Sequence, residues 1–190
     1  MKIEIKTFQE LELQELYEVL QLRSEIFVVE QDCVYQDMDH KDQLAFHIIG
    51  YKEGRIVAYT RVFKPGDYFR EASIGRVLVR KSERQYGYGL EIMKASINTI
   101  HKKFGPSAIY ISAQKYLTKF YTSLGFKVVG EEYLEDGIPH VGMIRNNPLY
   151  HKKRAVLTAL SIIWMMNTIY ILMGILSLKL ISSNILSVNL

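Results

Sequence analysis

Two glycines lie one residue apart just ahead of a segment with helical spacing, an arrangement suited to binding phosphate. Gly87 and Gly89 close the stretch IGRVLVRKSERQYGYG, residues 74–89, in which an apolar run is followed by a polar turn. The free N–H groups at the start of a helix carry partial positive charge, and glycine lets a ligand approach the backbone closely. We therefore predict a strand, a glycine turn and a phosphate-binding helix N-terminus, with the charge of Arg84 beside it. Helical spacing continues at Leu90, Met93, Ile97, Ile100 and Phe104.

The same stretch departs from two common nucleotide-binding motifs. No Gly-Lys-Ser/Thr follows, so it is not a nucleoside-triphosphate loop. The dinucleotide fingerprint needs three glycines spaced GxGxxG after the first strand of a βαβ unit. A plain strand-to-helix connection without a ligand is the alternative for this stretch taken alone.

A second group of chemically active side chains lies within residues 32–47. It contains four aspartates and two histidines: Asp32, Asp37, Asp39, His40, Asp42 and His47. Calcium loops of the EF-hand type also need a glycine and a closing glutamate, which this span lacks, and we predict no metal site. We expect a solvated acidic loop. The alternative is a loop that walls an acceptor site and attracts a cationic amine.

Periodicity predicts the elements that would position these residues. Alternating side chains at Lys2–Phe8 predict a strand, and helical spacing predicts a helix at about Glu10–Arg23 with a further turn to Gln31. Later elements follow the order β-β-β-α-β-α-β-β, which gives an α+β or mixed α/β class. The later strands are predicted at 46–51, 55–63, 74–79, 109–112, 127–129 and 141–144, and the later helices at 90–104 and 115–124.

Composition indicates one domain with a sizeable core among the 190 residues. The single cysteine, Cys33, excludes an internal disulfide framework and fits a reducing compartment. The N-terminus has no apolar region typical of a signal peptide. Residues 1–150 contain all 20 acidic residues and 20 of the 24 Lys and Arg, so the net charge of +4 belongs to the end of the chain. The basic balance is therefore no indication of nucleic-acid binding.

Two longer stretches resemble the GNAT family of N-acetyltransferases. Arg84–Gly89, RQYGYG, resembles the family's R/Q-x-x-G-x-G/A pyrophosphate loop. Gln114–Phe126 resembles its N-x-x-A-x-x-[LF]-Y-x-x-x-G-F segment, although Gln114 replaces the Asn and Leu117 replaces the Ala. The resemblance covers about residues 1–147. Shorter segments resemble the ElaA-like branch of the family: 22–23, 27–31, 35–37, 39, 75–77 and 136–143.

The resemblance implies the GNAT fold, a mixed and mostly antiparallel sheet flanked by helices, with acetyl-CoA as co-substrate and no metal. It implies direct acetyl transfer in a ternary complex, so Cys33 is not expected to be an acyl carrier. Tyr121 would be the general acid toward the CoA thiolate, or alternatively a packing tyrosine. The resemblance places the cofactor against Val77, Leu78, Val79, Arg84, Gln85, Tyr86, Gly87, Tyr88, Gly89 and Gln114.

The acceptor side is less defined. An amine must lose a proton before it attacks a thioester. The base is left open between Glu30, Asp37 and His140, or a water that they hold, with Glu30 and His140 as catalytic candidates. Arg23 and Arg76 are candidates to hold an acceptor carboxylate, and Asp37 is a further candidate for substrate binding. Salt bridges to acidic neighbours are the alternative for both arginines.

The last forty residues lie outside the resemblance. Residues 151–154 form a basic linker, and residues 155–178 contain 24 consecutive uncharged residues. Such a helix would reach about 36 Å, enough to cross a hydrocarbon core of about 30 Å. We predict a membrane anchor there, a short tail at 179–190, and a cytoplasmic catalytic domain at 1–150. A helix packed on the domain, an oligomer interface and a segment without a selected role are the alternatives.

These observations predict an acetyl-CoA-dependent N-acetyltransferase that acts on a primary amine of a small molecule or peptide. The alternative is a catalytically weak CoA-binding sensor or interaction module of the same fold, tethered to the membrane. The sequence defines neither the acceptor nor the oligomeric state.

Overall fold

The computed structural model describes residues 1–147, 160–161 and 164–165. The chain divides into two units, Met1–Asn147 and Pro148–Leu190. None of the helices among the described residues is both long and apolar enough to cross a bilayer. The predicted linker at 151–154, the tail at 179–190 and nearly all of the predicted anchor at 155–178 lie outside the described residues.

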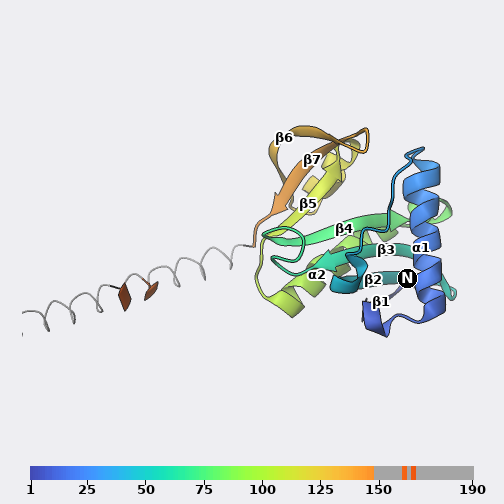
Figure 1. Cartoon of the computed structure of the whole chain (residues 1–190), viewed down its shortest axis with the longest axis horizontal. Helices are drawn as coiled ribbons and strands as arrows, with labels where there is room; N and C mark the ends of the chain where they lie inside the picture. Colours follow the sequence, from blue (N-terminus) through green and yellow to red (C-terminus); the bar gives the residue numbers. More distant parts are fainter. Residues whose placement is uncertain (148–159, 162–163, 166–190) are drawn as a thin grey trace, which may run out of the picture. The chain divides into compact units, whose positions relative to one another are not determined.

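Within residues 1–147, seven strands form one sheet in the order β1-β2-β3-β4-β5-β7-β6 (Figure 1). All neighbouring strands there are antiparallel except β4 and β5, which are parallel. The predicted order of strands and helices is confirmed. The strands are β1 Lys2–Thr7, β2 Phe46–Lys52, β3 Arg55–Phe63, β4 Ala72–Val79, β5 Ile109–Gln114, β6 Lys127–Glu135 and β7 Ile138–Arg145. The helices are α1 Leu13–Arg23, α2 Tyr88–Phe104 and α3 Thr118–Ser123.

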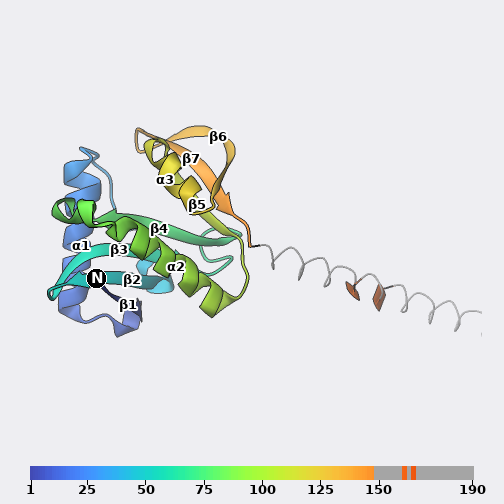
Figure 2. The same ribbon diagram turned by 180° about the vertical axis from the view of Figure 1, so that it is seen from behind.

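Helices cover both faces of the sheet (Figures 1 and 2). On one face, α2 and α3 bury Ile92, Met93, Ile100 and Tyr121 against the strands. On the other face, α1 and the π-helical segment Ser24–Glu30 bury a second cluster. Its members are Val19, Leu22, Ile26, Phe27, Ile49, Ile56, Tyr59 and Leu78.

Strands β4 and β5 pair over a short stretch and then separate. Their hydrogen-bonded register contains Ala72 with Ile109 and Ser73 with Tyr110. Beyond these pairs the two strands diverge in both views of the fold (Figures 1 and 2). The divergence leaves backbone groups of β4 unpaired on the side that faces β5.

A β-bulge at Arg76 changes which face β4 presents. The register of β4 against β3 shifts between Tyr59 and Arg61, and Arg76 has φ 50°. One extra residue in a strand moves the following side chains to the opposite face. Ile74 accordingly packs in the cluster under α2 and α3 (the α2 cluster), whereas Leu78 packs in the second cluster, under α1 and Ser24–Glu30.

The last two strands are longer than predicted. The turn between β6 and β7 contains only Asp136 and Gly137, both with positive φ, as in two-residue type I′ hairpins. The strands predicted at 127–129 and 141–144 imply a longer connection between them, which the structure corrects. The apolar pattern failed because β6 is exposed along its whole length and contains three glutamates.

Candidate functional site

The predicted phosphate loop lies between β4 and α2. Residues Lys81–Tyr86 form a 3₁₀ turn, and Gly87 precedes α2 with φ 74°. A left-handed residue at this point favours glycine because it has no Cβ. No side chain caps the N-terminus of α2 within the described chain. The N–H groups of Leu90 and Glu91 donate to the carbonyl of Gly87, which leaves those of Tyr88 and Gly89 to bind an anion.

Arg84 has a carboxylate partner in this structure. Its Nη1 lies 2.7 Å from Oε1 of Glu30, and its Nη2 donates to Oε2 at 3.0 Å. Arg84 Nε also donates to the carbonyl of Val79 at 3.2 Å. The pair joins the predicted cofactor loop to Ser24–Glu30, and it occupies the carboxylate that we predicted as a general base.

The backbone of Val77–Val79 borders the opening between β4 and β5. Leu78 and Val79 pair with Tyr59 and Ala58 of β3 on their other side. The side chains of Val77 and Val79 pack against the α2 cluster. This wall of the opening is therefore held by β3 and by core packing, and the 3₁₀ turn follows it in the chain.

Tyr121 lies on α3 and is 5% exposed. Its ring makes edge contacts with Phe120 and Phe126. Burial raises the pKa of Tyr121, with a smaller contribution from Tyr116. The hydroxyl therefore keeps its proton at neutral pH, which a general acid requires, and the packing also fits the alternative of a structural tyrosine.

His140 lies on β7, opposite Gln114 of β5 and Tyr133 of β6. Its Nδ1 is 2.8 Å from the carbonyl oxygen of Ile138. A carbonyl only accepts, so in the neutral imidazole this contact places the proton on Nδ1 and leaves a lone pair on Nε2. The tautomer suits a proton acceptor, and the ring of Tyr133 stacks against it.

Two contacts tie the segment after Ser24–Glu30 to the far strands. Gln114 Nε2 donates to Oε1 of Gln31 at 3.1 Å. Cys33 Sγ donates to the carbonyl of Asp136 at 3.3 Å. The segment therefore lies next to the end of β5 and the β6–β7 turn. The sequence gives no local signal for Gln31, because its partner Gln114 lies 83 residues away.

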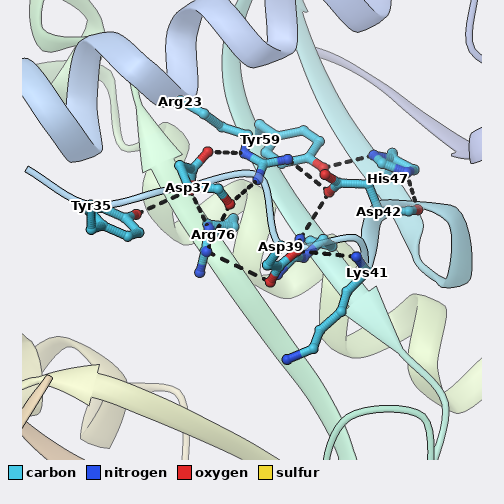
Figure 3. Close-up of polar contacts among 10 residues, drawn as sticks. Arg23, Tyr35, Asp37, Asp39, Lys41, Asp42, His47, Tyr59 and Arg76 are labelled. Atoms are coloured by element: carbon cyan, nitrogen blue, oxygen red, sulfur yellow. Dashed lines mark hydrogen bonds and ion pairs between the residues drawn. The ribbon is translucent and has the colours of Figure 1, made fainter. Parts of the chain in front are cut away.

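Arg23 and Asp37 form part of a buried ion-pair network (Figure 3). Arg23 is fully buried, and its Nε and Nη1 each lie 2.7 Å from a carboxylate, of Asp37 and Asp42 respectively. Arg76 Nε donates to the other oxygen of Asp37 at 2.6 Å. Both arginines thus make salt bridges to acidic neighbours, the alternative given for them from the sequence. The prediction that Arg23 contacts an acceptor carboxylate directly is wrong for this conformation, because the guanidinium has no exposed surface.

Arg61 of β3 completes the network. Its guanidinium lies 2.7 Å and 2.6 Å from the two oxygens of Asp39 and 2.9 Å from Asp42. His47 bridges the hydroxyl of Tyr59 at 2.7 Å and the carbonyl of Asp42 at 3.0 Å. Burial lowers the pKa of His47.

The expectation of a solvated acidic loop is therefore wrong. Asp37 and Asp42 are each 7% exposed and paired with arginines. Three arginines and three aspartates balance the charge of the network and hold residues 37–42 against the sheet. Among the described residues, no three His, Cys, Asp or Glu side chains gather as a metal site.

A family model, described as an acetyltransferase (GNAT) domain, matches residues 9–146. The chain belongs to the GNAT family. This GNAT protein is similar to Protein ElaA of Escherichia coli (strain K12), with 43% identity over 138 residues, covering 72% of this chain and 90% of that protein. The predicted family and its ElaA-like branch are thus confirmed.

Two crystal structures resemble this GNAT chain. One is an acyl-CoA N-acyltransferase from Pseudomonas aeruginosa, with TM-score 0.72, 37% identity, and coverage of 76% of this chain and 99% of that chain. The other is Escherichia coli ElaA, with TM-score 0.72, 39% identity and the same coverage of both chains. The predicted GNAT acyltransferase fold is confirmed for the part that they cover.

Proposed function

We propose that this GNAT protein transfers the acetyl group of acetyl-CoA to a primary amine of a small molecule or peptide. One observation carries the proposal: β4 separates from β5 directly beside the uncapped N-terminus of α2. The opening offers unpaired backbone to an extended pantetheine arm, and the helix offers N–H groups to its pyrophosphate. A single bound acetyl-CoA would occupy both.

The cofactor site is proposed to use backbone more than side chains. The amides of residues 84–89 would hold the pyrophosphate, and the backbone of residues 77–79 would align the pantetheine. Gln114, at the end of β5, would contact the cofactor from the other wall. The guanidinium of Arg84 would bind a phosphate once its ion pair with Glu30 has broken.

The catalytic groups are proposed to come from the β5 side of the opening and from opposite faces of the sheet, because Tyr121 packs in the same cluster as Val141 and Met143 whereas His140 alternates with them on β7. Tyr121 would protonate the departing thiolate, since its raised pKa keeps the hydroxyl protonated. His140 is the better candidate for the base, because its Nε2 has a lone pair while the carboxylates of Glu30 and Asp37 are held by arginines. The amine would then attack the thioester directly, with no covalent enzyme intermediate.

A free-CoA assay with a panel of primary amines tests the proposal. We expect acetyl-CoA and an amine to release CoA in the presence of the wild-type chain. The Tyr121→Phe variant should release CoA about a hundredfold more slowly, the range for loss of a general acid, and bind acetyl-CoA equally well. An equal rate in the variant would reject Tyr121 as the acid.

The second candidate function is a CoA-binding sensor or interaction module with little turnover. The Arg84–Glu30 pair favours it in one respect, because the cofactor loop is already linked to a neighbouring segment that could report cofactor binding. Tight acetyl-CoA binding without CoA release for any amine in the panel would support this candidate over the enzyme.

A further inference from the structure

Three side chains from β5 and β6 form a hydrogen-bonded chain across β7. Ser112 Oγ lies 2.6 Å from the hydroxyl of Tyr133 and 2.6 Å from Oε2 of Glu135. A carboxylate can only accept, so Ser112 donates its proton to Glu135 and accepts the proton of Tyr133. The direction of donation is thus from Tyr133 to Ser112 to Glu135.

This arrangement presents acceptors and no hydroxyl protons to a ligand. Both hydroxyl protons are used within the chain of hydrogen bonds, which leaves lone pairs on Ser112 and on Glu135. Across residues 1–147, Glu135 has no ion-pair partner, whereas the neighbouring Glu132 is paired with Lys115 at 2.5 Å. A primary ammonium is the matching ligand, because it has three donors, a positive charge and no acceptor.

The residue of β7 that the chain of hydrogen bonds crosses is a glycine and has no side chain. Gly142 is the register partner of Ser112. A Cβ at Gly142 would lie 2.6 Å from the hydroxyl oxygen of Tyr110 and 3.0 Å from the carbonyl oxygen of Val129. Glycine is therefore needed for Tyr110 to lie over β7, beside the cluster. Burial raises the pKa of Tyr110, and Tyr133 and Glu135 add to the effect.

The cluster begins at Ser112 of β5, the strand that borders the opening between β4 and β5. Extending the parallel register of Ser73 with Tyr110 by two residues would place Ser112 opposite Gly75, but the strands have separated by then. A Cβ at Gly75 would meet no atom within 4 Å, so there is open space on the β4 side. Ser112 also lies on the same face of β5 as Gln114, since side chains alternate along a strand.

We infer that Ser112, Tyr133 and Glu135 bind the ammonium group of the acceptor, and that the acceptor is a primary amine without an adjacent carboxylate. An α-carboxylate would lie near the carboxylate of Glu135. Arg23 and Arg76, the residues predicted to hold such a group, are engaged by Asp37. The inference rests on the proposed function and names the substrate class of the same site.

Three matched pairs of probes test it, each an amino acid and the amine left by removing its carboxylate. They are norleucine with pentylamine, tyrosine with tyramine, and lysine with cadaverine. Binding is measured by saturation-transfer NMR and calorimetry, on the protein alone and on its complex with CoA. We expect at least one amine to bind, and to bind at least about tenfold more tightly than its amino acid. The reason is that the ammonium makes a charge-assisted contact with Glu135, whereas the carboxylate of the amino acid is repelled by it.

Variants locate the binding to the cluster. Glu135→Gln and Ser112→Ala should weaken amine binding about tenfold or more, and Tyr133→Phe should weaken it less. Glu131→Gln changes a carboxylate on the same exposed strand and serves as the matched control, with no effect expected. Circular dichroism melting confirms that each variant is folded.

Several results would overturn the inference. They are the absence of binding for all three amines, equal binding of amines and amino acids, and amine binding unaffected by Glu135→Gln in a folded variant. Failure of CoA to bind is a separate result that would reject the proposed function, and the amine titrations of the protein alone would still decide the inference.

Discussion

Asp37 is the residue on which the buried network depends most. Both of its carboxylate oxygens accept from arginines, Arg23 of α1 and Arg76 of β4. Asparagine at this position would leave the buried guanidinium of Arg23 and the partly buried one of Arg76 short of their counter-charge, so we expect a loss of about 3–5 kcal/mol of unfolding free energy. Urea denaturation measures it.

A matched control for Asp37→Asn is Asp67→Asn. Asp67 pairs with an exposed lysine, Lys64, at 3.5 Å. Loss of this surface pair should cost less than about 1 kcal/mol. If the two variants lose similar amounts of stability, the buried network does not hold the loop as described.

Asp39 makes the network sensitive to acid. Burial alone would raise the pKa of Asp39, but the hydrogen bonds and charge of Arg61 outweigh it and lower the pKa from 3.8 to about 2. A carboxyl group whose pKa is lower in the folded state than in the unfolded state stabilises the fold at pH values above its unfolded-state pKa. This contribution is lost as pH falls from about 4 toward about 2. The melting temperature, measured from pH 5 to pH 2, should fall less steeply in Asp39→Asn than in the wild type. Parallel curves for the two proteins would contradict this assignment.

Arg84 links two elements, the 3₁₀ turn before α2 and the segment Ser24–Glu30. If Arg84 binds a phosphate of the cofactor, the carboxylate of Glu30 competes with that phosphate for the guanidinium. Glu30→Gln should then tighten acetyl-CoA binding about two- to fivefold, the range for a partly exposed ion pair. Calorimetric titration measures the affinity.

Glu25→Gln is the control for this prediction. Glu25 lies in the same segment and pairs with Arg80 at 3.1 Å, outside the predicted phosphate loop. We expect no change in affinity. Weaker acetyl-CoA binding in Glu30→Gln would indicate that the pair supports the loop rather than competes for Arg84.

Elements with a strong local pattern were predictable from the sequence. The apolar run of β4, the glycine at 87 and the spacing in α2 predicted that connection correctly. Strand β6 was predicted too short because its exposed residues show little apolar alternation. The network was not predicted because Arg61 lies in a buried strand and meets Asp39 and Asp42 from 22 and 19 residues away.

At the scale of the whole molecule, the family and the acyltransferase fold could be predicted for residues 1–147, the part of the chain to which the relatives align. The candidate site required pairings that only the fold shows, such as Gln31 with Gln114 and Ser112 with Glu135. The membrane anchor at 155–178 stays a prediction from the sequence, because nearly all of it lies outside the described residues.

The anchor prediction can be tested by truncation. The full-length chain should co-sediment with lipid vesicles, because 24 uncharged residues favour the hydrocarbon core. A chain of residues 1–147 should stay in the supernatant and bind acetyl-CoA with the same affinity. A full-length chain that purifies as a monomer without detergent would reject the anchor.

Acetyl-CoA is proposed to bind in the opening between β4 and β5, with its pyrophosphate at the N-terminus of α2. Calorimetric titration of the wild-type chain with acetyl-CoA tests it most directly. We expect one saturable site, with binding weakened by Gly87→Val, because a β-branched residue is strained at φ 74°. Absence of a binding isotherm for the folded wild-type chain would contradict it.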